Sequence, residues 1–320
     1  MTDTQKVWGW QVAAYLFLAG VGAGAYLTSF VVSQVVPELA ILLRIGILLG
    51  APLVIIGIIF LVIDLGKKAR ALLVFSQPGT SWIARGTIII TAFVILDLIY
   101  LGTLIWPFTV IAGAPGLQLA LGIITALFAV LTLLYTGMVL GTAKSIAFWD
   151  PWFLPGLFLV SGISTGAMCL TLYLSIYGFS AGQVLEQPLM LLGRYDTFII
   201  LVEALIIAFY LVKMYQRSDA RSSARVVTQG NLAPHFWAGV VLAGLVVPFA
   251  VEMYLTSLPA TATAAMLVLT LAAGIIGLIG GFMLRYLVIA GGASLALNVR
   301  GIPVPVPRTS KIADYRQFTL

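Results

Sequence analysis

The sequence predicts an all-α integral membrane protein with eight transmembrane helices arranged as two four-helix bundles. Hydrophobic residues make up 61% of the 320 residues and charged residues only 9%, and the mean hydropathy is +1.11. Soluble domains carry about 25% charged residues. Apolar stretches of 18 or more residues recur along the whole chain, and each can cross a ~30 Å hydrocarbon core as a helix. Little length remains for a soluble catalytic domain.

Eight helices follow from these apolar stretches, because each stretch is bounded by charged residues, prolines or polar turns. Eight is an even number, so the chain begins and ends on the same side of the membrane, here called side A. The expected helices cover residues 7–32, 38–63, 82–106, 116–142, 153–178, 189–213, 236–257 and 262–290.

The first and fifth helices share a glycine pattern, since LFLAGVGAGA at 16–25 aligns with FLVSGISTGA at 158–167. Small residues four positions apart let helices approach closely in lipid. The repeat predicts two halves in the same orientation, residues 1–143 and 144–290, each a four-helix bundle. Three closely spaced prolines in residues 291–320 predict an extended, non-helical tail.

The basic residues lie almost entirely on side A. Of the 17 lysines and arginines, only Arg44 and Arg194 fall on side B. By the positive-inside rule, side A is cytoplasmic in a prokaryotic inner membrane. A basic face for an acidic partner subunit is the alternative explanation. The net charge of +6 reflects these loops and gives no indication of nucleic-acid binding.

The chain contains one histidine, His235, and one cysteine, Cys169. Paired histidines for haem and four cysteines for an iron–sulfur cluster are therefore lacking, and no zinc site can be assembled around His235. If the protein handles electrons, it must use a bound organic molecule together with the metals of a partner.

Four acidic residues fall inside the expected helices: Asp97, Asp196, Glu203 and Glu252. Ionisable groups at membrane depth are costly and often mark proton or ion routes. Asp196 and Glu203 are seven residues apart and share one helix face. The four residues are candidates for a proton route from side B. Alternatively they are structural ties between helices, and Asp196 pairs with Arg194 near the surface.

A second group of polar and aromatic residues is expected at side A. An opposite-charge pair beneath an aromatic rim can hold a polar ring headgroup whose tail lies in lipid, as a menaquinone or ubiquinone requires. Membership of the interfacial aromatic belt is the alternative for the aromatic residues, and a simple surface position is the alternative for the histidine. The candidate quinone-binding residues are Gln11, Tyr15, Asp64, Ser81, Trp82, Arg85 and His235.

Several motifs, in this order and spacing, resemble the NrfD/polysulfide reductase (PsrC) type of membrane subunit over nearly the whole chain. The motifs are W-x-W with YLFLAGVGAGAYL, the DLG at 64–66, SWIARG at 81–86, D-x6-E at 196–203, FWAGV…P at 236–248, and GGFMLRYLVIAGG at 280–292.

The resemblance implies a metal-free eight-helix core that binds quinone and anchors a ferredoxin-like iron–sulfur subunit, usually with a molybdopterin catalytic subunit. It also implies that Asp64, the stretch 81–85 and the start of the first helix border the quinone, and that Glu203 belongs to a proton relay. The sequence departs from the polysulfide reductase subunit at Tyr15, where that subunit has a histidine, and at Val12, where it has an asparagine.

The expected orientation in the membrane also differs from that of this family. The partner subunits of the best-known relatives lie outside the cytoplasm. Here the charge distribution predicts a cytoplasmic partner. The expected function is that of a quinone-binding anchor subunit of a respiratory oxidoreductase. Protons reach the quinone either from side A through Asp64, His235 or Tyr15, or from side B through Glu203 and Asp97. The second route would couple turnover to the membrane potential. A proton-coupled secondary transporter or channel is the alternative.

Overall fold

The computed structural model describes residues 8–64, 81–105, 113–143, 146–181, 186–257, 264–292, 297–299 and 302–304. Eight helices in this part of the chain are long and apolar enough to cross a membrane, so the prediction of an all-α fold with eight spans is confirmed. They are α1 (Trp10–Val35), α2 (Ile41–Asp64), α3 (Trp82–Leu104), α5 (Pro115–Gly141), α6 (Phe153–Ala181), α7 (Glu186–Gln216), η3 (His235–Val246) continued by α9 (Val247–Ser257), and α10 (Ala264–Ala290).

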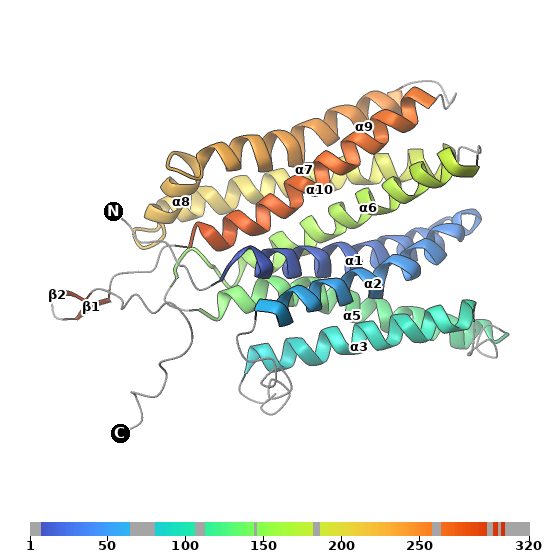
Figure 1. Ribbon diagram of the computed structural model, residues 1–320, viewed down its shortest axis with the longest axis horizontal. Coiled ribbons are helices and arrows are strands. Elements are labelled where there is room, and N and C mark those ends of the chain that lie inside the picture. Colours follow the sequence, from blue (N-terminus) through green and yellow to red (C-terminus); the bar gives the residue numbers. More distant parts are fainter. Residues whose placement is uncertain are drawn as a thin grey trace.

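The helices can be divided into two sets of four, which meet along α1 and α6 (Figure 1). One set contains α1, α2, α3 and α5, and the other contains α6, α7, α10 and the continuous helix η3–α9. The start of α1 and the end of α10 lie at the same end of the molecule (Figure 1). Helices α1 and α6 are the most buried spans and lie against each other where the two sets meet.

Glycines bring α1 and α6 into backbone contact. A Cβ atom at Gly24 would overlap the carbonyl oxygen of Gly162, and one at Gly166 would overlap the backbone of Gly24. The repeated glycine patterns of the two helices therefore face each other, as small-residue interfaces in lipid require.

The seventh span begins as a π-helix, a feature that the apolar pattern does not predict. The N–H of Val247 donates to the carbonyl of Leu242, five residues back. Pro248 follows at once, and in a regular α-helix its ring would clash with the carbonyl of Gly244. The wider turns relieve that clash and bring Gly244 into backbone contact with Gly280 of α10.

Short elements complete the described residues. The 3₁₀-helix η1 (Pro37–Leu39) joins α1 to α2, and α8 (Arg221–Thr228) lies in the long polar connection after α7. In the tail, β1 (Leu297–Val299) and β2 (Ile302–Val304) form an antiparallel pair, so these six residues are extended but paired with each other.

A cluster around Asp150 fixes the connection between α5 and α6. The Asp150 carboxylate accepts hydrogen bonds from the backbone N–H groups of Trp152 (2.9 Å) and Phe153 (3.2 Å). It also forms ion pairs with Lys213 (3.2 Å) and Arg217 (3.0 Å) at the end of α7. Burial alone would raise the pKa of Asp150, but these hydrogen bonds and the Lys213 charge outweigh burial and lower it.

Aromatic contacts tie the same connection to the rest of the side-A end. The indole N–H of Trp149 donates to the carbonyl of Val288 on α10 (2.8 Å). Trp8 stacks on Trp149, with ring centroids 5.2 Å apart. The hydroxyl of Tyr210 on α7 donates to the carbonyl of Phe148. These contacts hold Trp8 just before α1, the last turns of α7 and the last turns of α10 against the segment 146–150.

We expect Gly24→Ala to separate α1 from α6, since its methyl group would overlap the Gly162 carbonyl. Overpacking of this kind costs about 1–3 kcal/mol, and thermal unfolding in detergent should show a lower midpoint. Gly156→Ala on α6 is the matched control, because a Cβ there meets nothing within 4 Å. An equal loss in both variants would argue against the tight crossing.

Asp150→Asn should lower the free energy of unfolding at pH 7 by about 1–3 kcal/mol, because hydrogen bonds to charged partners are lost. The folded-state pKa of Asp150 is lowered, so its contribution is complete above the unfolded value near 3.9 and is lost as the pH falls through the folded value. The difference from the wild type should therefore shrink below about pH 4. Asp219→Asn removes an ion pair whose carboxylate is 38% exposed and should change little.

Candidate functional site

Two buried carboxyl groups of α7 face the interior of the second helix set. Asp196 is 0% exposed and Glu203 is 5% exposed. The D-x6-E spacing predicts that they share a face, and both lie against residues of α6. Ionisable groups at this depth need polar partners, because the surrounding hydrocarbon supplies none.

Arg285 of α10 is the largest fully buried side chain among the described residues, at 1% exposed. Its position near the end of the last expected helix places it, from the sequence alone, only at the level of side A. One terminal nitrogen, Nη1, donates to the Ser161 hydroxyl (2.7 Å) and to the Gly281 carbonyl (2.9 Å). The guanidinium also lies over the rings of Phe17 (5.6 Å) and Phe158 (5.5 Å), contacts that stabilise a desolvated cation.

The position of Arg285 depends on a glycine of α1. A Cβ atom at Gly20 would lie 2.9 Å from Nη2 of Arg285. Neither Nη2 nor Nε has a hydrogen-bond partner among the described residues. The glycine therefore leaves the room that the guanidinium occupies, and α1 forms one wall of its site.

Ser161 connects Arg285 to Glu203. Its hydroxyl accepts from Arg285 and lies near enough to the Glu203 carboxyl to interact with it. The positive charge of Arg285 additionally attracts that carboxyl directly. A serine between two opposite charges can accept from one and donate to the other, so the three side chains form one polar unit joining α6, α7 and α10.

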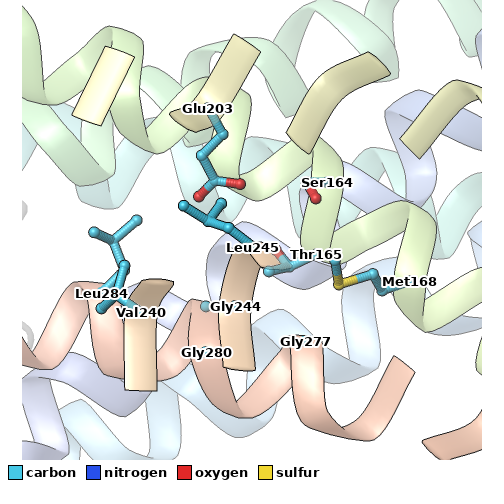
Figure 2. A pocket seen from close by; sticks show the side chains of 11 residues that line it. Ser164, Thr165, Met168, Glu203, Val240, Gly244, Leu245, Gly277, Gly280 and Leu284 are labelled. Atoms are coloured by element: carbon cyan, nitrogen blue, oxygen red, sulfur yellow. The ribbon is translucent and has the colours of Figure 1, made fainter. Parts of the chain in front are cut away.

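The Glu203 carboxyl faces a small cavity (Figure 2). Figure 2 shows the glutamate reaching from α7 toward Leu245, with Ser164 and Thr165 of α6 beside them. The cavity volume is about 10 Å³, near the lower limit for a single water molecule. Glycines of α10 and Gly244 of η3 form much of the rest of its wall.

Beyond the cavity, a second polar group continues toward side B. The Ser164 hydroxyl donates to Asp196 (2.7 Å). The Thr197 hydroxyl donates to Glu252 of α9 (3.2 Å), and the carboxyl groups of Asp196 and Glu252 lie close enough to interact. The expected surface pairing of Asp196 with Arg194 is therefore wrong, because Asp196 is buried and its partners lie on α6 and α9.

Asp97 belongs to the other helix set. It is 0% exposed and its carboxylate accepts from the backbone N–H of Ala51 on α2 (2.6 Å). A Cβ atom at Gly50 would lie 2.6 Å from the same oxygen. The structure thus brings Asp196, Glu203 and Glu252 together around α7, whereas Asp97 ties α3 to α2 just before Pro52.

The candidate quinone-binding residues divide into inward and outward groups. Tyr15 is 5% exposed and interacts with Tyr135 of α5, and Gln11 is half-buried one turn earlier on α1. Trp82 is 40% exposed on α3, and the exposed Arg85 lies over its ring at 5.0 Å.

The three remaining candidates for quinone binding lie at helix ends. The Ser81 hydroxyl accepts from the N–H of Ala84 (3.3 Å) and so caps α3. Asp64 is the last residue of α2. His235 is exposed as the first residue of η3, and this helix packs chiefly on α10. Among the described residues, no three His, Cys, Asp or Glu side chains gather as metal ligands would.

Comparisons with known proteins agree with this architecture. The sequence profile of the family described as "Polysulphide reductase, NrfD" matches residues 1–296. "Protein NrfD" of Escherichia coli is 26% identical over 313 residues, covering 89% of the sequence described here and 95% of that protein. The C subunit of the polysulfide reductase of Wolinella succinogenes is 30% identical over 269 residues, covering 78% and 84%. The similarity extends over both helix sets.

A double-mutant cycle should reveal the coupling between Arg285 and Glu203. Arg285→Met and Glu203→Gln each remove one of two buried opposite charges, so each leaves the other less compensated. The combined variant should lose less stability than the two losses added, by about 0.5–3 kcal/mol. Arg285→Met combined with Asp97→Asn is the control and should be additive, because Asp97 lies in the other helix set. Additivity in both pairs would contradict the coupling.

Proposed function

Because the protein belongs to the polysulphide reductase NrfD family, we propose that it is the quinone-binding anchor subunit of a respiratory oxidoreductase. It exchanges electrons between a menaquinone or ubiquinone and an iron–sulfur partner subunit. The observation that carries this proposal is the series of ionisable groups in the second helix set, of which Arg285, Glu203 and Asp196 are buried and Glu252 is half-buried. Such a series is costly in a membrane and is typical of proton transfer.

The quinone headgroup binds near the side-A ends of α1 and α2. The Gln11 amide and the Tyr15 hydroxyl supply hydrogen-bond donors there, and Asp64 supplies a carboxyl group at the end of α2. The rings of Trp10 and Phe60, 5.8 Å apart, supply apolar walls. These residue types suit a ring with two carbonyl oxygens and an isoprenoid tail. Trp82 and Arg85, which face outward from α3, contact the quinone as it arrives from the lipid.

The cavity beside Glu203 has a different role. Sites for small organic molecules have volumes of about 300–1,000 Å³, and this cavity measures about 10 Å³. It therefore cannot hold a quinone ring. Glu203, Asp196 and Glu252 instead exchange protons between side B and the protein interior.

The bound quinone supplies the two-electron, two-proton chemistry that no side chain of this protein provides. Gln11 and Tyr15 orient its ring, and Asp64 holds or delivers a proton at side A. Electrons must leave to a partner, since one histidine and one cysteine cannot hold a series of metal centres. We assign a ferredoxin-like iron–sulfur subunit, with a molybdopterin catalytic subunit beyond it, to the basic and cytoplasmic side A.

A proton-coupled transporter or channel is the alternative use for the same buried acids. The two functions differ in whether proton movement requires a redox partner. In a channel, Glu203 would conduct protons without quinone turnover. In the oxidoreductase, proton movement stops when electron transfer stops.

The test uses the native complex in proteoliposomes with a quinone analogue. Asp64→Asn should weaken analogue binding by about tenfold or more, because a hydrogen-bonding carboxyl of the headgroup site is lost. Glu203→Gln should leave analogue binding unchanged and reduce proton uptake from side B per electron. Asp219→Asn, whose carboxylate is partly exposed and pairs with Arg217, is the matched control.

Unchanged analogue binding in Asp64→Asn would remove that residue from the quinone site. Proton conduction by the isolated protein without any electron donor would support the channel and overturn the oxidoreductase.

A further inference from the structure

The polar row along α6 is interrupted at one point. On one side, Arg285 donates to Ser161, and both lie near enough to Glu203 to interact with its carboxyl group. On the other side, Ser164 donates to Asp196, which interacts with Glu252. The cavity lies between these two units, because both Glu203 and Ser164 line its wall.

The wall of the cavity offers partners for a small polar ligand. The Glu203 carboxyl points into it (Figure 2). The Ser164 hydroxyl proton is engaged by Asp196, so its oxygen lone pairs remain available to the cavity. The Thr165 hydroxyl donates to the carbonyls of Ser161 and Gly162 and can likewise still accept. A buried water needs about two to four such partners and a volume of about 10–15 Å³.

We infer that this cavity binds a single water molecule, which hydrogen-bonds Glu203 and Ser164 and joins the two polar units into one proton-conducting row. The inference rests on the proposed function, for which it supplies the connection between the two units. Water is the ligand of suitable size and chemistry, since the cavity of about 10 Å³ excludes larger molecules and its apolar walls disfavour an ion.

The transfer balances without any redox change. The Glu203 carboxyl gives its proton to the water oxygen, and the water gives one of its own protons to Ser164 Oγ. Ser164 then releases its hydroxyl proton to the Asp196 carboxylate, to which it already donates. Each O–H bond that forms is matched by one that breaks, and the reverse sequence follows when the hydroxyl groups have reoriented.

Val240 offers a way to remove the water without touching a polar group. It lies on η3 and lines the cavity, where it is 2% exposed. Val240→Leu adds a methylene group that fills the cavity, whereas Val240→Ala enlarges it. The two variants change the same position in opposite directions, so a structural effect of the position alone would appear in both.

Infrared difference spectra of the native complex, recorded on quinone reduction, provide the first test. The wild type and Val240→Ala should show a water O–H band that shifts in oxygen-18 water. This band should be lost in Val240→Leu, and proton uptake from side B per electron should fall about tenfold. The Glu203 carboxyl band, identified by its loss in Glu203→Gln, should still respond in Val240→Ala.

A density map of the native complex provides a second test that does not depend on turnover. One ordered water within hydrogen-bond distance of Glu203 and Ser164 supports the inference, and a side chain filling that space overturns it. A Glu203 response without any water band also overturns the inference but leaves the proposed function intact. Absence of quinone-dependent electron transfer in the wild type would overturn both.

Discussion

The charge of Arg285 is the constraint around which the second helix set is built. A guanidinium in a membrane interior is tolerated only with hydrogen-bond acceptors, aromatic faces or a counter-charge nearby. Ser161 and Gly281 supply acceptors, Phe17 supplies one of the ring faces, and Glu203 supplies the opposite charge. Four helices contribute to this one site, so the position of α1 relative to α6, α7 and α10 is coupled to the electrostatic balance around one side chain.

The same glycine pattern occurs in α1 of the first helix set and in α6 of the second. Gly20 and Gly24 of α1 correspond to Gly162 and Gly166 of α6 in the sequence repeat, and these glycines form the crossing between the sets. The residues that precede and separate these glycines differ between α1 and α6. The positions of Ser161, Ser164 and Thr165 in α6 correspond to Ala19, Gly22 and Ala23 in α1. The three hydroxyl groups close together on α6 therefore have no counterparts at the matching positions of α1.

The helices, the D-x6-E face and the glycine contacts could be predicted from the sequence, because each depends on local spacing or on apolar length. The side chains and backbone groups that contact the acidic residues could not be predicted from the sequence. Nothing in the spacing distinguishes Asp97, which accepts from a backbone N–H of α2, from Glu252, which lies beside Asp196. From the sequence, Arg285 can be placed only at the level of side A, because it lies near a helix end. Its burial depends on Gly20, a glycine of a helix far earlier in the sequence, a relation that only the tertiary structure shows.

The π-helical segment has a consequence for how the seventh span tolerates insertion and deletion. Each residue of an α-helix turns the backbone by about 100°. Removing one residue between His235 and Val246 would favour ordinary α-helical hydrogen bonding and would rotate everything before the deletion relative to α9. Gly239, which now lies against Met283 of α10, would then turn toward a different neighbour. The length of this segment therefore sets the angular alignment between its side-A end and the carboxyl group of Glu252.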